Sequence, residues 1–288
     1  MEYFKKSAPN KTAFITGAAS GLGRALTLEL AAQNWTIGIC DLNTNGLKET
    51  QELAEQSGGK IQSYSLNITD STRFQEICSD FLAKTNSIDV LINNAGIGAS
   101  GKTDELSIEY WNKVIGINQM AVVFGCKFFI PQMKKQGSGT IINIASAAAF
   151  SSAAGMGPYN VSKAAVLSLS ETLHAELKDE NISVSVVMPT FFKTNIMQDV
   201  STDSEGRRLG ELMIATSGLE PDAVARTILK AASKKQFYII LPWKSKMLYI
   251  AKRWMPGLML KINAMLYRKR EKLEKMLEKK YQKQQAEK

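Results

Sequence analysis

Short apolar runs and longer stretches of helical spacing alternate along most of the chain. The apolar runs are rich in β-branched residues and cover residues 12–16, 36–40, 61–66, 90–93, 140–144, 184–188 and 238–241. Between them, apolar side chains recur at helical spacing over residues 24–33, 47–56, 71–84, 108–135, 162–178 and 221–234. Because the strands are too apolar to have one face in water, we predict an α/β fold with a doubly wound, parallel, seven-stranded sheet and helices on both faces.

The sequence changes character after Pro242. Residues 244–288 contain 14 Lys or Arg and four Glu, a net charge of +10, whereas the whole chain of 288 residues carries +9. The basic excess therefore lies in the tail, and the preceding residues are nearly neutral. We interpret residues 1–242 as one α/β domain and residues 243–288 as a basic amphipathic helical tail.

The tail is apolar as well as basic. Two stripes at helical spacing, separated by Pro256-Gly257, consist of Met247, Ile250, Ala251 and Trp254, and of Leu258, Ile262, Met265 and Leu266. Trp and Tyr among cations are typical of segments at an anionic membrane surface, so peripheral membrane attachment is one prediction. Packing on the domain or across an oligomer interface is the alternative. Nucleic acid is not expected, because the cations are interleaved with aliphatic rather than stacking side chains.

Cysteine usage and the N-terminus predict a cytoplasmic protein. Cys40, Cys78 and Cys126 stand far apart, with no CxxC or Cys/His ligand spacing, so we expect neither a disulfide framework nor a metal site. The first ten residues carry two lysines and no apolar stretch, which argues against a signal peptide. No uninterrupted apolar run of spanning length is apparent either. The single histidine, His174, has no partner at a catalytic spacing.

A glycine-rich turn follows the first predicted strand. In Thr16-Gly-Ala-Ala-Ser-Gly-Leu-Gly23 the glycines occupy positions 17, 21 and 23, and a predicted helix opens behind them. Glycine permits a tight turn and leaves room for a pyrophosphate, while the helix N-terminus offers free N–H groups. The turn therefore predicts dinucleotide binding through Gly17, Ser20, Gly21, Leu22 and Gly23.

Asp41 bears on the choice of cofactor. It ends the second predicted strand 18 residues after Gly23, close to the spacing expected of an acidic ribose ligand. A carboxylate can accept both ribose hydroxyls of NAD but repels the 2′-phosphate of NADP. Ser20 and Leu42 supply no compensating cation, and Arg24 lies inside the helix. The sequence favours NAD over NADP.

Tyr159 and Lys163 form a candidate catalytic pair. They are four residues apart near the start of a predicted helix and so share one face. A phenol has an unperturbed pKa of about 10, which a nearby ammonium can lower by roughly one to three units. Tyr159 would then serve as a general acid or base for an alcohol proton.

Four further segments accompany the glycine-rich turn. These are Asn93-Asn94-Ala95-Gly96, Asn118, Ser146 and Tyr159-Asn-Val-Ser-Lys163. With these motifs in this order and spacing, the chain resembles the classical short-chain dehydrogenase/reductase (SDR) family over about residues 10–240. The resemblance implies a Rossmann-type sheet, NAD(P)-dependent interconversion of an alcohol and a carbonyl compound, and homodimers or homotetramers built through the long helices.

The resemblance also implies a role for each matching residue. Tyr159 transfers the proton, Lys163 also binds the nicotinamide ribose, Ser146 hydrogen-bonds the substrate oxygen, and Asn118 holds a water that links Lys163 to solvent. Further cofactor contacts are implied for Asn67, Asn94, Ala95, Gly96 and Thr194.

Two positions depart from the family pattern. Asn67 stands where the family usually has an Asp that contacts adenine, although an amide oxygen can still accept a hydrogen bond. Pro189-Thr190 replaces the usual Pro-Gly, which removes a flexible glycine beside the nicotinamide. Thr194 retains the hydroxyl that binds the carboxamide in the family.

The residues expected to face the substrate are apolar or small. They comprise residues 147–150, Met156, Phe191, Phe192 and Met197, with direct contacts predicted for Ser146, Phe150, Tyr159 and Phe191. Such a lining favours a lipophilic alcohol or ketone. The alternatives are an NADP-dependent ketoreductase and, from another class, a non-catalytic, membrane-associated scaffold that binds a nucleotide. The intact Ser146, Tyr159 and Lys163 argue against the scaffold.

Overall fold

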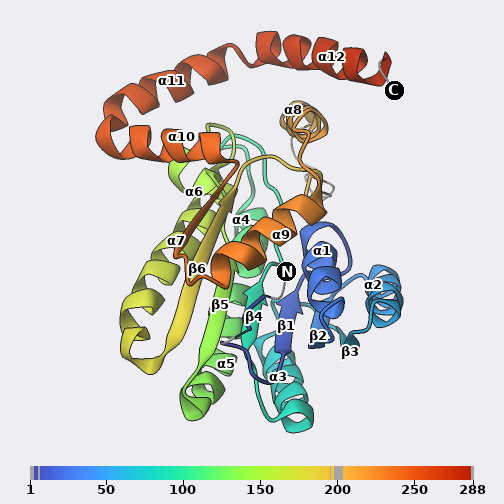
Figure 1. Ribbon diagram of the computed structural model, residues 1–288. Helices are drawn as coiled ribbons and strands as arrows, with labels where there is room; N and C mark the ends of the chain where they lie inside the picture. The colour runs from blue at the N-terminus through green and yellow to red at the C-terminus, as the bar shows by residue number, and fades with distance from the viewer. Residues whose placement is uncertain (1–2, 6, 195, 198–203, 287–288) are drawn as a thin grey trace.

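A seven-stranded parallel sheet with the order β3-β2-β1-β4-β5-β6-β7 forms the centre of the protein (Figure 1). The computed structural model describes residues 3–5, 7–194, 196–197 and 204–286. Each pair of neighbouring strands is parallel. The strands are β1 (Thr12–Thr16), β2 (Thr36–Asp41), β3 (Lys60–Ser65), β4 (Val90–Asn93), β5 (Gly139–Ile144), β6 (Ile182–Pro189) and β7 (Tyr238–Leu241). The predicted seven-stranded, doubly wound sheet is confirmed.

Helices cover both faces of this sheet, and each face has its own apolar core. One face carries α1 (Gly21–Ala31), α2 (Thr44–Gln56) and α9 (Pro221–Ala232), and the other carries α3 (Ser71–Thr85), α5 (Ala121–Gln136) and α7 (Gly157–Glu176). Leu26 and Ile228 are buried in the first core, and Phe14 and Phe129 in the second. Burial on both faces explains why the strands are continuously apolar.

Capping side chains set the starts of two helices. Asn43 accepts a hydrogen bond from the backbone N–H of Gly46 (3.0 Å), so α2 begins three residues before the predicted start at residue 47. Asp70 accepts one from Arg73 (2.9 Å), and α3 begins at Ser71 as predicted. The apolar spacing in the sequence marks only the part of a helix that packs on the core. It can therefore miss a first turn that begins at a capping residue.

The predicted helix over residues 108–135 is divided by a π-helical turn. It consists of α4 (Ile108–Ile115), the π turn η1 (Gly116–Met120) and α5. By length and composition alone, this run from residue 108 to 136 could cross a membrane. It packs against the sheet through residues such as Val122 and Phe129. The π turn, which holds Asn118, was not predicted.

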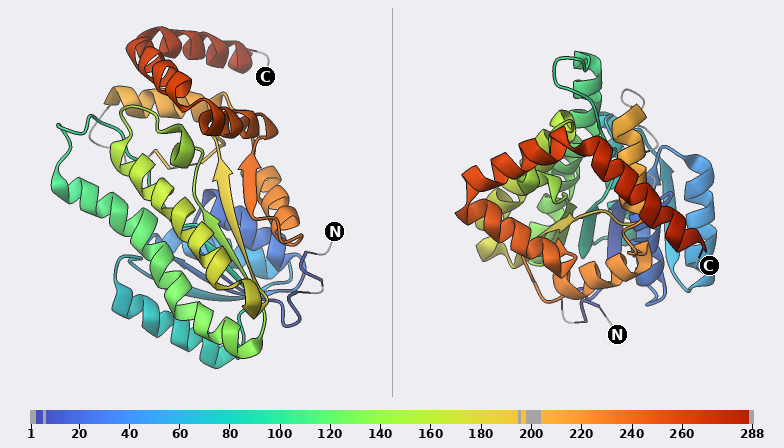
Figure 2. Two further views of the ribbon diagram at one scale, coloured as in Figure 1. Left: turned by 90° about the vertical axis from the view of Figure 1, so that its left-hand side faces the viewer. Right: turned by 90° about the horizontal axis from the view of Figure 1, so that it is seen from above.

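The tail folds into three helices that cross the end of the molecule above the carboxyl ends of the strands (Figure 2). They are α10 (Trp243–Trp254), α11 (Pro256–Arg268) and α12 (Arg270–Ala286), with the expected break before Pro256. Below α12 lies α8 (Ser204–Ala215). The remaining short helices are α6 (Ala148–Ser151) and the 3₁₀ turn η2 (Lys178–Glu180). Neither α6 nor α8 was predicted.

Candidate active site

A cavity of about 620 Å³ lies at the carboxyl ends of the strands. The strand order reverses between β1 and β4, and ligands of doubly wound sheets bind in the crevice at such a point. The predicted cofactor residues that line the cavity are Gly17, Ser20, Gly21, Leu22, Asp41, Asn67, Asn94, Ala95, Gly96, Tyr159, Lys163 and Thr194. Gly23 is the exception.

The glycine-rich turn needs its glycines for different reasons. Gly17 and Gly21 have φ of +68° and +53°, in the left-handed region that side chains disfavour. A Cβ on Gly17 would lie 2.7 Å from the Cα of Ala95, and one on Gly23 would overlap the carbonyl oxygen of Gly17. Gly23 therefore acts by letting α1 pack against the turn. The space left in front of the turn fits a dinucleotide pyrophosphate.

The loop after β4 is fastened to this turn by hydrogen bonds. The Asn94 amide donates to the carbonyl oxygens of Thr16 and Gly17, both at 3.0 Å. The Thr16 hydroxyl accepts from the backbone N–H groups of Asn94 and Ala95, also at 3.0 Å. Asn94 thus positions the turn. Thr16 is a positioning residue that was not predicted from the sequence. Its place at the end of β1, directly before the glycine-rich turn, is the signal that could have indicated this role.

Asp41 faces the adenosine end of the cavity. Its carboxylate accepts hydrogen bonds from the backbone N–H of Ala19 (3.0 Å) and of Asn43 (2.9 Å). Arg24 is directed towards α2, where its guanidinium donates to Glu49 (2.7 Å) and to the carbonyl oxygen of Ala19 (2.6 Å). The basic side chain next to the glycine-rich turn is thereby engaged by an acidic one.

The other two implied cofactor contacts lie at opposite ends of the cavity. Asn67 uses its side-chain oxygen within its own loop, where it accepts from the Thr69 hydroxyl (2.8 Å) and backbone N–H (3.2 Å). Thr194 lies over the start of α1, with its hydroxyl oxygen 3.6 Å from where a Cβ of Gly21 would be.

Lys163 and Asn118 meet around Gly96. The Lys163 ammonium, buried beneath the cavity, donates to the carbonyl oxygen of Ile144 at 3.0 Å. A Cβ on Gly96 would lie 3.2 Å from both the Lys163 Nζ and the Asn118 Oδ1. A side chain at this position would therefore crowd both groups.

The π turn directs Asn118 into the protein, where it is fully buried. Its Oδ1 accepts from the backbone N–H of Ile97 (2.8 Å), and its Nδ2 donates to the Ile97 carbonyl (2.9 Å) and to Ser162 (3.2 Å). π turns are frequent at functional sites because the added residue changes the direction of side chains. The water implied for Asn118 stays a prediction.

Tyr159 is buried at the inner end of the same cavity. Ser146 is a hydrogen-bonding partner of its phenol, and the Ser146 hydroxyl also accepts a hydrogen bond from the N–H of Ala148 (3.1 Å). Burial raises the pKa of Tyr159, and the bond from Ser146 opposes this rise. Burial also lowers the pKa of Lys163 to about 8.

The expectation that Lys163 lowers the pKa of Tyr159 is therefore wrong for this structure. The Lys163 Nζ lies 5.8 Å from the centre of the Tyr159 ring and is directed towards Ile144. Loss of hydration outweighs attraction at this distance. Tyr159 is consequently a protonated acid at neutral pH, and Ser146 is its hydrogen-bonding partner.

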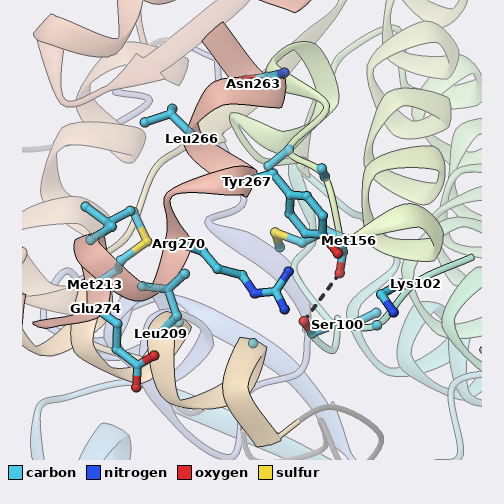
Figure 3. Close-up of a pocket in the computed structure, with 18 of the residues that line it drawn as sticks. Ser100, Lys102, Met156, Leu209, Met213, Asn263, Leu266, Tyr267, Arg270 and Glu274 are labelled. Atoms are coloured by element: carbon cyan, nitrogen blue, oxygen red, sulfur yellow. Dashed lines mark hydrogen bonds between the residues drawn. The ribbon is translucent and has the colours of Figure 1, made fainter. Parts of the chain in front are cut away.

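A second cavity, of about 380 Å³, lies beneath the tail (Figure 3). Its walls are the loops at residues 99–102 and 153–156, Phe191, Met197, α8, and the tail helices α11 and α12. Met156 and Ala99 line this cavity and belong to the apolar cluster that contains Tyr159. Tyr159 thus lines the first cavity and belongs to an apolar cluster that reaches the second.

The two phenylalanines predicted to contact substrate are in different places. Phe191 lines the second cavity. Phe150 does not line either cavity, because it is buried against the edge of Tyr249 in α10, with ring centres 5.2 Å apart. The prediction that Phe150 contacts the substrate is therefore wrong for this structure. The tail covers this side chain, and the sequence pattern of residues 1–242 could not indicate that contact.

The tail is fastened to the domain by polar contacts. The Asn263 amide donates to the carbonyl oxygen of Ser151 (2.6 Å), and Lys280 donates to that of Thr216 (3.0 Å). Arg208 of α8 pairs with Glu274 (3.1 Å) and with Glu278. In Figure 3 the Arg270 guanidinium points into the cavity, 4.9 Å from the centre of the Tyr267 ring. The tail therefore packs on the domain with one side.

The fold and this site are those of an oxidoreductase that binds a nicotinamide dinucleotide, and comparison with known proteins gives its family. The family model for short chain dehydrogenases matches residues 11–205. The chain is 33% identical over 229 residues to 3-oxoacyl-(acyl-carrier-protein) reductase FabG of Thermotoga maritima, covering 80% of this chain and 93% of that protein. It is 32% identical to 2,5-dichloro-2,5-cyclohexadiene-1,4-diol dehydrogenase LinX of Sphingobium indicum, covering 80% of this chain and 91% of that one.

Among solved structures, a short-chain dehydrogenase/reductase from Burkholderia phymatum in complex with NAD superposes with a TM-score of 0.83 at 27% identity. The match covers 90% of this chain and 96% of that one. The chain belongs to the short-chain dehydrogenase family. It is an NAD(P)-dependent oxidoreductase that acts on a CH–OH group of a small molecule.

Proposed function

We propose that the protein interconverts a lipophilic alcohol and its ketone or aldehyde with NAD, and that Tyr159 is the general acid and base. The position of Tyr159 carries this proposal, because Tyr159 lines the dinucleotide cavity and shares a buried apolar cluster with Ala99 of the second cavity. Nicotinamide, when bound, accepts a hydride from the alcohol carbon or returns it to the carbonyl carbon.

The residues of this chain handle the proton and the orientation of the substrate. In oxidation, deprotonated Tyr159 takes the proton of the substrate hydroxyl, and in reduction the neutral phenol supplies it. Ser146, the hydrogen-bonding partner of the phenol, is proposed from its match to the family motif to orient the substrate oxygen. The Lys163 ammonium, held by the carbonyl oxygen of Ile144 beneath the cavity, would bind the ribose of the nicotinamide nucleotide.

The reaction is tested with the purified full chain and a panel of secondary alcohols of increasing apolar length. Absorbance of the reduced cofactor reports turnover with NAD and with NADP in parallel. We expect turnover with NAD and rising kcat/KM as the apolar part lengthens. Turnover with NADP alone would identify an NADP-dependent ketoreductase. Cofactor binding without turnover on any substrate would favour the non-catalytic scaffold.

NAD is favoured over NADP by the surroundings of Asp41. The carboxylate lies where the adenosine ribose would bind, and Arg24 is held by Glu49. The two lysines that line the cavity are Lys113 on α4 and Lys163 at its inner end. A 2′-phosphate would meet a negative charge at this position, with unfavourable energy.

The apolar wall from the tail supports a lipophilic substrate, and two adjacent residues of α11 offer a matched test. Leu266 lines the second cavity, whereas Met265 does not, although the two side chains are similarly exposed, at 47% and 46%. We expect Leu266→Ala to raise KM for long-chain alcohols about threefold to tenfold, because each buried CH₂ contributes about 0.8 kcal/mol.

In this experiment KM for a short alcohol should not change, and Met265→Ala should behave as the wild type. Equal effects of the two substitutions, or a loss that does not depend on chain length, would place the substrate elsewhere.

Assembly as a homodimer or homotetramer is proposed from family membership, as is a cytoplasmic location. The long helices α5 and α7 are the candidate interface. Light scattering of the purified chain measures the assembly directly.

A further inference from the structure

The outward face of α10 is apolar. Trp243, Met247, Ile250 and Trp254 are 70%, 63%, 48% and 80% exposed. Their spacing places all four side chains in one stripe along the helix. Two tryptophans exposed in one stripe are unusual, because soluble proteins seldom leave large contiguous apolar patches in water.

Contacts on the opposite side fix this orientation. Tyr249 packs against Phe150 and Tyr238, with ring centres 5.2 Å and 5.8 Å apart, and Ser245 is buried. The helix is therefore held on the domain through its inner side, so the apolar stripe has no place in the core of this chain.

Cations flank the stripe. Lys244, Lys246 and Arg253 are exposed on α10 beside it. On α11 the exposed Leu258, Leu260 and Met265 continue the apolar surface, with Lys261 and Arg268 beside them. This surface is apolar at its centre and positive at its margins. Residues 244–288, which include it, carry a net charge of +10.

We propose that this surface of α10 and α11 binds to an anionic phospholipid bilayer, with the stripe at the level of the headgroups. Trp side chains are favoured at this depth because they have an apolar ring and a polar N–H. Each Lys or Arg near an anionic surface contributes about 1 kcal/mol to binding. The surface fits the pattern of a helix that lies in the plane of the membrane.

A second copy of the chain fits this surface less well. A two-fold dimer places the same patch of both copies in contact, so the interface would gather Lys244, Lys246 and Arg253 from both copies. Like charges brought together across an interface oppose association. An anionic bilayer would bury the apolar stripe and attract the flanking cations at the same time.

Membrane contact would place the second cavity beside the bilayer. α11 presents Met265 and Leu258 outwards and Leu266 and Tyr267 to the cavity. A lipophilic molecule dissolved in the membrane would then have a short path to the cavity under the tail. This last step rests on the proposed substrate class, whereas the membrane contact itself does not.

The test uses the full chain and sedimentation with vesicles of two compositions, phosphatidylcholine with phosphatidylglycerol and phosphatidylcholine alone. The wild type should sediment with the anionic vesicles and be released from them by salt. We expect the double substitution Met247→Glu and Trp254→Glu to weaken this binding at least tenfold. Leu53→Glu, an exposed apolar position on α2 outside the tail, should bind as the wild type.

A second variant tests the contribution of charge to vesicle binding separately from that of apolar burial. Replacement of Lys244, Lys246 and Arg253 by Gln should weaken binding at low salt and leave thermal stability unchanged, because the three side chains are exposed. Activity on a soluble short alcohol should be retained in both variants. This readout distinguishes failure of the membrane proposal from failure of the proposed reaction.

Three results would overturn the proposal. The first is no sedimentation of the wild type with anionic vesicles. The second is binding that is equal for both compositions and insensitive to salt. The third is a smaller particle in light scattering for the Met247→Glu and Trp254→Glu variant with vesicle binding unchanged, which would identify the surface as an interface between copies.

Discussion

Replacing Tyr159 with phenylalanine is expected to lower kcat by about 10²-fold to 10⁴-fold, the usual contribution of a positioned general acid or base. The ring is buried in an apolar cluster and keeps its packing, so the affinity for NAD should change little. Steady-state rates and titration of NAD by fluorescence measure the two effects separately.

Tyr110→Phe is the matched control for this prediction. Tyr110 belongs to the same buried cluster as Tyr159, and its hydroxyl lies 3.5 Å from the carbonyl oxygen of Gly98. The same atom is removed in both variants, but only Tyr159 adjoins the dinucleotide cavity. If the two variants lost activity equally, packing rather than proton transfer would explain the loss.

The pH dependence of the wild type should differ between the two directions. Burial raises the pKa of Tyr159, so the neutral phenol predominates at neutral pH. Oxidation needs the phenolate, and its rate should increase as pH rises. Reduction needs the phenol, and its rate should fall at high pH. Tyr159→Phe should abolish both dependences, and a profile that persists in the variant would assign the titration to another group.

Replacing Asp41 with asparagine is expected to shift the preference for NAD over NADP by about 10-fold to 100-fold. A hydrogen bond to a charged group contributes about 1.5–3 kcal/mol, and each 1.4 kcal/mol corresponds to a tenfold change. The substitution weakens binding of the ribose hydroxyls of NAD and removes the repulsion of the 2′-phosphate. The values of kcat/KM with each cofactor measure the shift.

Glu52→Gln removes an equivalent negative charge from an exposed position on α2 and should leave the cofactor preference unchanged. A wild-type enzyme that prefers NADP, or a preference that Asp41→Asn does not alter, would contradict the proposed role of Asp41.

Local sequence signals predicted the sheet and most of the residues of the first cavity. The bounds of β1, β4 and β7 agree with the predicted runs because buried parallel strands are continuously apolar and end at a polar residue or before a proline. The glycine-rich turn was predictable because the reasons for its glycines are local. Each glycine either adopts a positive φ or leaves no room for a side chain.

Features that depend on distant contacts were not predictable. The π turn at Gly116–Met120 leaves the apolar spacing of its helix nearly unchanged, and hydrogen bonds to Ile97 and Ser162 give Asn118 its direction. Burial of Phe150 depends on Tyr249, about 100 residues away in the sequence. Burial of Tyr159 reverses the pKa shift that the spacing to Lys163 suggested, because desolvation depends on the whole fold.

One wall of the apolar cavity comes from a different part of the chain than the groups proposed for the chemistry. Ser146, Tyr159 and Lys163 lie within the family match at residues 11–205, whereas Leu266, Tyr267 and Leu273 come from the helices after β7. Selection can therefore alter the range of accepted molecules through the tail without disturbing proton transfer. In protein engineering, exchange of residues 243–288 between relatives would amount to exchange of a specificity module on a constant catalytic unit.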